Sequence, residues 1–200
     1  MSSKTSILVL VIELLGSVVA NSDIRIFGSI LNAKWILTAA HCLKKGPSDY
    51  LIKVGTSDLS SGGTYHRFWR NISPLIELED EIEFSDLTQP IELETEVVGE
   101  VDAVVSGWGL DENDARPDNL KYLNTSILSD QQCSLSWGKR YWSSVEMFTL
   151  LGSDSGGPLV ANGKQIGVVS WGTAKCGSTQ PAVYARVSAY IDWIYNVINS

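Results

Sequence analysis

The stretch at residues 152–160 reads Gly-Ser-Asp-Ser-Gly-Gly-Pro-Leu-Val, and it constrains the fold more than any other part of the chain. Glycines allow positive φ angles, so they leave a side chain such as Ser155 exposed on a tight turn. The apolar residues after Pro158 indicate a buried strand that holds this turn rigidly. A plain Ser/Gly turn between two strands, without chemistry, is the alternative at this point, and the rest of the chain decides between the two.

Short apolar segments separated by polar loops recur along the whole chain. Strands are expected at residues 35–37, 50–54, 102–108, 122–128, 165–171 and 183–187. The last segment, Ser188–Ser200, instead places apolar residues at helical spacing, which predicts one amphipathic C-terminal helix. The acidic run from Leu75 to Glu100 is typical of a solvated face. With 17 glycines and 7 tryptophans, the chain is predicted to be all-β, with β-barrels and a terminal helix.

The N-terminal segment Met1–Ala20 has the features of a secretory signal peptide. Lys4 gives a positive start, Ile7–Leu15 gives an apolar core too short to span a bilayer, and small residues precede a cleavage site after Ala20. We therefore expect a secreted, extracellular protein of residues 21–200 with no membrane association after signal removal. A buried N-terminal helix is the alternative.

The net charge limits which partners the chain can bind, and the cysteine count limits which disulfides it can form. A formal net charge of -8 argues against a nucleic-acid partner, because phosphate binding needs clustered Lys and Arg. Secretion permits disulfides, but the 3 cysteines are an odd number, so at least one thiol is left over.

His41 and Ser155 are the pair of residues that could carry nucleophilic catalysis. A serine hydroxyl is a poor nucleophile until a neighbouring base removes its proton, and histidine titrates near neutral pH. The base needs a carboxylate that holds its tautomer, and the reaction needs backbone N–H groups aimed at the oxyanion. His66 lies in a polar context and is expected to be an ordinary surface or core histidine.

Several motifs, in the same order along the chain, resemble the chymotrypsin/trypsin-like serine proteases. Thr38–Cys42 and Asp154–Leu159 resemble the histidine and serine boxes of that family, and Ser170-Trp171-Gly172 resembles its substrate-binding strand. The matches continue with Gly107-Trp108-Gly109, Pro181–Val187 and the C-terminal helix, so the resemblance covers residues 28 to 200.

The resemblance implies two packed six-stranded β-barrels with an active site in the cleft between them. The first barrel would cover residues 24–100, the second residues 101–187, and the helix residues 188–200. His41 would be the general base and Ser155 the nucleophile of peptide-bond hydrolysis in a protein or peptide substrate. The N–H groups of Ser153 and Ser155 would form the oxyanion hole, although the family has glycine at the position of Ser153. A monomer without cofactor or metal is expected.

The same resemblance assigns substrate contacts to Ser170, Trp171 and Gly172, and a specificity pocket to Thr149 and Ala182. Trypsin-like enzymes carry aspartate at the position of Thr149, so cleavage after Arg or Lys is not implied. Ala182 replaces a glycine of many members and would narrow the pocket.

The start of the chain departs from the family pattern. Arg25-Ile26 resembles an activation cleavage site, whose freed ammonium would pair with Asp154 in the family. However, Ile26 runs almost directly into Gly28–Leu31, which resembles the strand before the histidine box. The family's first strand is therefore expected to be missing, which leaves one barrel with an open edge and keeps Ile26 from reaching Asp154.

The triad aspartate has no clear counterpart either. Asn71–Ile76 resembles the strand that carries it in the family, and Ile72 or Ser73 occupies the carboxylate position, with Asp80 and Asp86 further along. Each cysteine also lacks its family partner: the partner positions fall near Ile26 for Cys42, near Phe148 for Cys133 and at Leu151 for Cys176. Three missing disulfides, each worth about 2–4 kcal/mol, would weaken a domain of ordinary stability.

Three hypotheses follow from the matches and the departures. The first is a secreted serine endopeptidase. The second is a catalytically inactive homologue that binds proteins through the former substrate cleft. The third is an incomplete product that does not fold stably.

Overall fold

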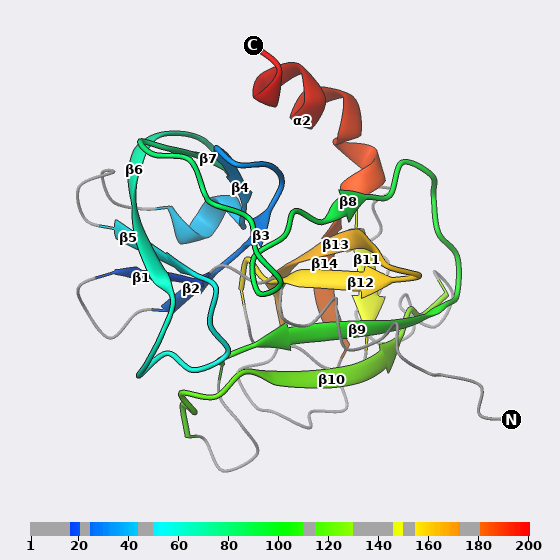
Figure 1. Ribbon diagram of the computed structural model, residues 1–200. Coiled ribbons are helices and arrows are strands. Elements are labelled where there is room, and N and C mark those ends of the chain that lie inside the picture. The colour runs from blue at the N-terminus through cyan, green and yellow to red at the C-terminus, as the bar shows by residue number, and fades with distance from the viewer. Residues whose placement is uncertain are drawn as a thin grey trace, which may run out of the picture.

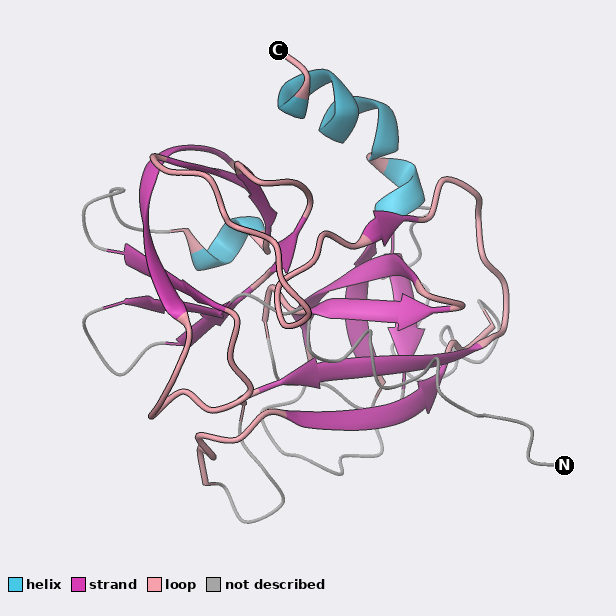
Figure 2. Ribbon diagram, in the orientation of Figure 1, coloured by secondary structure: helices cyan, strands magenta, loops and turns pink. Residues whose placement is uncertain are grey.

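The protein consists of two β-sheets that lie side by side, with a helix at the C-terminal end (Figure 1). The computed structural model describes residues 17–20, 25–43, 50–109, 115–129, 146–149, 155–172 and 181–200. Strands dominate these residues, and Figure 2 shows helix only beside the first sheet and at the C-terminus. None of the helices in the described ranges is long and apolar enough to cross a membrane.

The first sheet contains seven strands in the order β2-β1-β5-β6-β7-β4-β3, all paired antiparallel. Its strands are β1 (Ser17–Ala20), β2 (Arg25–Phe27), β3 (Ser29–Ile30), β4 (Trp35–Leu37), β5 (Tyr50–Val54), β6 (Thr64–Ile72) and β7 (Leu75–Leu78). Its apolar side chains are buried in one cluster that includes Ile30, Ile36, Ile52, Phe68 and Ile76. Burial of this apolar area is the main force that holds the sheet curled around its core.

The second sheet runs in the order β10-β9-β12-β13-β14-β11, and β8 pairs with β13 in parallel. Its strands are β8 (Glu92–Leu93), β9 (Asp102–Gly107), β10 (Lys121–Ser126), β11 (Glu146–Thr149), β12 (Pro158–Ala161), β13 (Lys164–Trp171) and β14 (Ala182–Arg186). A second apolar cluster, with Val105, Leu159, Ile166 and Tyr184 among its members, forms the core of this sheet.

A third cluster joins both sheets to the C-terminal helix. The chain leaves β14 through the short 3-10 helix η5 (Val187–Ala189) and continues as α2 (Ile191–Ile198). Leu37 and Leu75 of the first sheet pack with Val168 of the second and with Ile194 of α2. The helix therefore closes the junction between the two sheets.

Polar contacts also cross this junction. The Ser29 hydroxyl donates a hydrogen bond of 2.6 Å to Oε1 of Gln165, and both side chains are fully buried. Phe27 stacks on Trp108 with ring centroids 6.0 Å apart. Trp108 in turn donates its indole N–H to the carbonyl of Ser57 at 3.2 Å. These contacts fix the relative position of the two sheets.

The first sheet starts earlier in the chain than the sequence predicted. Strand β1, at Ser17–Ala20, lies within the segment predicted to be a signal peptide and pairs with both β2 and β5. The sheet therefore includes residues that precede the predicted start of the first barrel at about residue 24. A short apolar segment suits a strand as well as a signal sequence, so the sequence does not distinguish the two. The predicted cleavage site Arg25-Ile26 lies inside β2, where Ile26 pairs with Val18.

Candidate active site

His41 lies on a single turn of 3-10 helix, η2 (Ala40–Cys42), directly after the buried strand β4. The backbone N–H of Thr38 donates to the carbonyl of Pro74 at 3.1 Å, which anchors the start of the turn. The N–H of Cys42 then donates to the carbonyl of Ala39 at 3.0 Å and closes it. The imidazole is exposed at the surface as a result.

Ser155 opens the tight turn that precedes β12, and its side chain is half-buried. The next residue, Gly156, has a φ of +92°, in the region that L-residues rarely adopt. Its N–H donates to the carbonyl of Val169 at 2.9 Å, and the N–H of Val169 donates to the carbonyl of Gly157 at 2.9 Å. These two hydrogen bonds hold the serine turn against strand β13.

The serine turn also packs closely against the segment that leads to His41. A Cβ atom on Gly156 would lie 2.2 Å from the carbonyl oxygen of Phe27 and 2.3 Å from Oγ1 of Thr38. These two atoms are already joined, since Thr38 Oγ1 donates to the Phe27 carbonyl at 2.6 Å. Only glycine fits at this position, for steric as well as conformational reasons.

Two hydrogen bonds connect the surroundings of His41 to Ser155 itself. The Sγ of Cys42, the residue after His41, donates to the backbone carbonyl of Ser155 at 3.6 Å. The N–H of Phe27 donates to the same carbonyl at 3.4 Å. The structure thus brings together the histidine and serine segments, although they are more than a hundred residues apart in the sequence.

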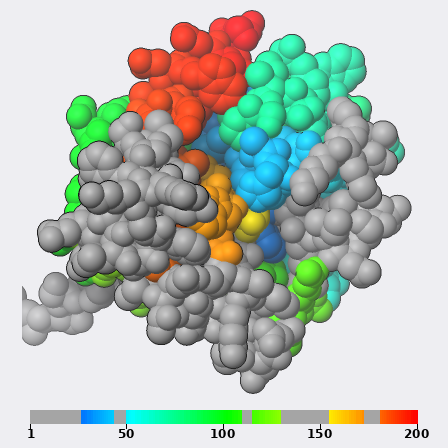
Figure 3. All heavy atoms as spheres, turned by 180° about the vertical axis from the view of Figure 1, so that it is seen from behind, coloured from blue at the N-terminus to red at the C-terminus, as the bar shows by residue number. Residues whose placement is uncertain are grey.

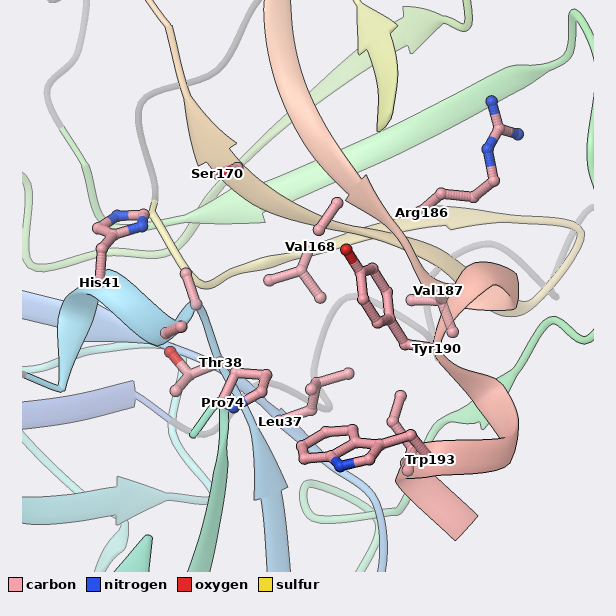
Figure 4. A pocket seen from close by; sticks show the side chains of 14 residues that line it. Leu37, Thr38, His41, Pro74, Val168, Ser170, Arg186, Val187, Tyr190 and Trp193 are labelled. Carbon is pink, nitrogen blue, oxygen red and sulfur yellow. The ribbon is translucent and has the colours of Figure 1, made fainter. Parts of the chain in front are cut away.

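A cavity of about 340 Å³ extends from His41 toward the C-terminal helix. Its walls come from β4, from β13 and β14, and from the η5–α2 segment, and they are mostly apolar: Leu37, Pro74, Val168, Val187, Trp193 and Ile194. Figure 4 shows the His41 imidazole at one edge of this cavity, with Tyr190 across it. On the molecular surface the region is hollowed between the blue histidine segment, the orange β13 and the red helix (Figure 3).

The substrate-binding residues predicted from the sequence lie mostly on the second sheet. Ser170 and Trp171 end strand β13, Ser170 lines the cavity beside His41, and the following Gly172 is exposed. Ala182 is buried in β14 and pairs with Thr149 of β11. The two positions predicted to form a specificity pocket are therefore cross-strand neighbours.

Other predicted site residues lie outside the described ranges. Ser153, Asp154, Cys133 and Cys176 belong to this group, so the oxyanion hole and the role of Asp154 stay predictions. Cys42 is a thiol and not half of a disulfide. In the described part of the chain no group of His, Cys, Asp and Glu side chains could hold a metal ion.

The segment that resembles the family's aspartate-bearing strand, Asn71–Ile76, contains a tight turn. β6 ends at Ile72, β7 begins at Leu75, and these two residues pair directly, so only Ser73 and Pro74 form the connection. Pro74 lines the cavity next to the histidine segment. Among the described residues that line this cavity, none is Asp or Glu.

Asp80, one of the carboxylates considered from the sequence, acts on a different histidine. Burial lowers the pKa of His66 on β6, and the charge of Asp80 partly opposes this shift. That His66 is an ordinary histidine without a catalytic role stays a prediction. Pro74 and Tyr190 line the cavity beside His41 but were not predicted as site residues, because they fall within the ranges expected to form a strand (71–76) and a helix (188–200). A tyrosine among aliphatic residues of that predicted helix was the available signal.

Comparisons with known proteins agree on one family. The family model described as Trypsin matches residues 18–194. Trypsin alpha of Drosophila melanogaster is 33% identical over 198 residues, covering 86% of this chain and 77% of that protein. Trypsin II-P29 of Gallus gallus is 32% identical, covering 86% of this chain and 78% of that protein.

A solved structure shares the fold. Neuropsin, described as a serine protease expressed in the limbic system of mouse brain, superimposes with a TM-score of 0.80 at 25% identity. The match covers 94% of this chain and 95% of that chain. The predicted all-β, chymotrypsin-like architecture with a C-terminal helix is confirmed.

Proposed function

The chain belongs to the trypsin family of serine proteases, and on that premise we propose that it is a secreted serine endopeptidase acting through Ser155 and His41. The observation that carries this proposal is the joining of the two segments. Cys42 Sγ, beside His41, bonds the carbonyl of Ser155, and Gly156 fits against Thr38 with no room for a side chain. Protein or peptide substrates follow from the family.

In the proposed reaction, His41 takes the proton of the Ser155 hydroxyl while Oγ attacks the carbonyl carbon of the scissile peptide bond. The tetrahedral oxyanion would accept hydrogen bonds from the N–H groups of Ser153 and Ser155. His41 then gives the proton to the leaving amine, the C–N bond breaks, and an acyl-enzyme forms. In the second half of the reaction, water attacks the acyl carbonyl carbon while His41 takes its proton. His41 then returns the proton to Oγ of Ser155, the ester bond breaks, and the acid product leaves.

The sequence has no clear counterpart of the family's triad aspartate, and this departure sets the expected rate. In chymotrypsin-like proteases, loss of the carboxylate behind the histidine lowers kcat about ten-thousand-fold, yet leaves catalysis well above the uncatalysed reaction. Because the Ser73-Pro74 turn lies in the segment that resembles the family's aspartate-bearing strand, we expect catalysis slower than that of a complete triad.

The lack of a clear counterpart of the triad aspartate also favours a second candidate function. In this alternative the chain is a catalytically inactive homologue that binds proteins through the former substrate cleft. The two candidates differ in the reactivity of Ser155, because only an activated serine reacts with a fluorophosphonate. Wild-type protein, Ser155→Ala, and Ser60→Ala as a matched surface control would be incubated with a fluorescent fluorophosphonate, and labelling measured on gels.

Labelling of wild type and Ser60→Ala but not of Ser155→Ala is expected if the chain is a peptidase. Absence of labelling in a protein that unfolds cooperatively on heating would reject catalysis and leave the binding role. Absence of any cooperative transition would instead identify an incomplete product. Secretion and a monomeric state are checked by mass spectrometry of the culture medium and by light scattering.

A further inference from the structure

The sequence contains two Asn-X-Ser triplets, the acceptor pattern for N-linked glycans. Asn124-Thr125-Ser126 ends strand β10, and Asn71-Ile72-Ser73 covers the end of β6 and the start of the turn after it. Such triplets arise often by chance, so the pattern alone selects neither. A glycan is bulky and lies in solvent, so the surroundings of each asparagine in the folded chain decide which of them can carry one.

Asn124 lies on the outer face of the second sheet. Leu123 packs against the second apolar cluster and Thr125 is buried, whereas Tyr122, Asn124 and Ser126 are exposed. Successive side chains of a strand point to opposite faces of the sheet. The amide of Asn124 therefore projects away from the core and into solvent.

A glycan on Asn124 would leave the pairing of the strand intact. β10 pairs with β9 over its whole length, with Asn124 opposite Val104 and Ser126 opposite Asp102. The Ser126 hydroxyl donates to Oδ1 of Asp102 at 2.7 Å. The side-chain amide of Asn124 makes no hydrogen bond to another described residue, so its modification breaks none of these contacts.

Tyr122 offers a surface on which the first sugar can pack. Its side chain is 60% exposed. It lies on the same face as Asn124, two residues before it and thus about 7 Å away along the strand. The C–H groups of a sugar ring pack on the negative face of an aromatic ring. A glycan at Asn124 would therefore cover aromatic surface that is otherwise in water.

The second triplet lies in more confined surroundings. Asn71 is half-buried and pairs with Ile76 in the β6–β7 hairpin. The carbonyl of Pro74 accepts the N–H of Thr38, which ties this hairpin to the histidine segment. Pro74 also restricts the backbone of Ser73, the hydroxyl residue of the triplet. A glycan on Asn71 would have to fit beside the junction of the two sheets.

We propose that Asn124 is an N-glycosylation site and that Asn71 is not. In the transfer, Nδ2 of Asn124 forms a bond to C1 of the first sugar of a lipid-linked oligosaccharide pyrophosphate. The bond from C1 to the pyrophosphate oxygen breaks, Nδ2 loses a proton, and the lipid pyrophosphate leaves. The proposal rests on the secretory route of the proposed function, because this transfer takes place during export. It does not rest on the reactivity of Ser155.

The glycan covers the end of the second sheet and leaves the candidate active site open. Strand β10 is the first in the sheet order and lies below β9 in Figure 1, with β9 and β12 between it and the cavity-lining β13. Its other edge pairs with no strand in the described part of the chain. Such an end strand favours aggregation through edge pairing, which a bulky and soluble glycan hinders.

The test uses the full chain, secreted by cultured animal cells and collected from the medium. Peptide-N-glycosidase F removes N-linked glycans and converts the asparagine that carried them to aspartate. Gel mobility before and after treatment reports occupancy, and mass spectrometry after treatment in heavy-oxygen water identifies the residue. The wild-type chain should show a single mobility shift, with the heavy oxygen at position 124.

Four variants locate the glycan. Asn124→Gln and Ser126→Ala each destroy the triplet and should abolish the shift. Ser126→Thr keeps both the triplet and a hydroxyl for Asp102, and should retain it. Asn71→Gln is the matched control and should leave the shift unchanged. Wild-type protein treated with the glycosidase should aggregate faster than untreated protein, with the same fluorophosphonate labelling of Ser155.

The outcomes separate this proposal from the proposed function. A secreted chain without a glycan, a heavy-oxygen label at Asn71, or a shift that survives Asn124→Gln would overturn the proposal. An unglycosylated chain retained in the cytosol would overturn it together with the secretory route. A glycan at Asn124 on a chain whose Ser155 never reacts with a fluorophosphonate would establish the site and reject only the peptidase.

Discussion

Gly156 is the residue on which the contact between the histidine and serine segments depends most directly. Its backbone combines a φ of +92° with an approach to Phe27 and Thr38 that leaves no room for a methyl group. Either property alone favours glycine. Together they mean that a substitution here separates the two halves of the site as well as straining the turn.

We expect Gly156→Ala to lower the free energy of unfolding by about 3 kcal/mol or more. Roughly 1–2 kcal/mol arises from an alanine at positive φ, and the rest from the overlap with Phe27 O and Thr38 Oγ1. Gly163→Ala is the matched control, because Gly163 also has a positive φ, +79°, but has no atom within 4 Å of a built Cβ. Urea unfolding measures both. Equal losses in the two variants would show that steric overlap at Gly156 contributes nothing.

At the level of elements, the junction of the two sheets depends on a buried polar pair within an apolar surround. Ser29 at the start of β3 donates to Gln165 near the start of β13, and Gln165 also donates from Nε2 to the carbonyl of Gly167 at 3.1 Å. Both residues are 0% exposed, so no water replaces a lost partner. The pair fixes the register between sheets more specifically than apolar packing does.

We expect Ser29→Ala to cost about 1–3 kcal/mol of unfolding free energy, because it leaves the Oε1 acceptor of Gln165 buried without its donor. The double variant Ser29→Ala/Gln165→Leu should lose less unfolding free energy than the sum of the losses in the two single variants. The reason is that it also removes the Gln165 acceptor that Ser29→Ala leaves without a donor. A double-mutant cycle by thermal or urea unfolding measures this coupling. Strict additivity would show that the hydrogen bond is not the source of the loss.

The strands that the sequence predicted best are those with several buried positions in a short apolar run. Strands at 35–37 and 50–54 are confirmed at these bounds, and the terminal helical segment is confirmed with α2 at Ile191–Ile198. The strand resemblance at Asn71–Ile76 covers only the first half of β7. The acidic neighbours of this segment suggested a solvated face, although Leu75 and Ile76 are fully buried. Local charge does not show which residues tertiary pairing will cover.

The candidate site was predictable where its chemistry lies in contiguous motifs and unpredictable where it depends on long-range packing. His41 and Ser155 stand in such motifs, and the structure places their segments in contact. The cavity is different, because it forms only where the Ser73-Pro74 turn, β13 and the C-terminal helix meet. The spacing of residues within one segment carries no information about a cavity whose walls come from three segments far apart in the sequence.

For the whole molecule, strand β1 raises a conflict between fold and processing. Ser17–Ala20 pairs with Tyr50–Lys53 of β5 over four positions and with β2 on its other side. Signal cleavage after Ala20, as the sequence predicts, would remove this strand and expose the edge of β5. It would also detach β2, whose Phe27 donates to the carbonyl of Ser155, from its neighbour in the sheet.

We therefore expect a chain that starts at Ser17 to be more stable than one that starts at Asn21. Losing β1 removes several backbone hydrogen bonds worth about 0.5–1.5 kcal/mol each, so the difference should be roughly 2–4 kcal/mol, or about 5–15 °C in Tm. Calorimetry on the two chains, with the full chain as reference, measures this difference. Mass spectrometry of the secreted protein shows which start the cell produces. Equal Tm values would show that β1 adds nothing to the sheet, whereas a product starting at Asn21 with a low Tm would mean that export itself weakens the support of the serine turn.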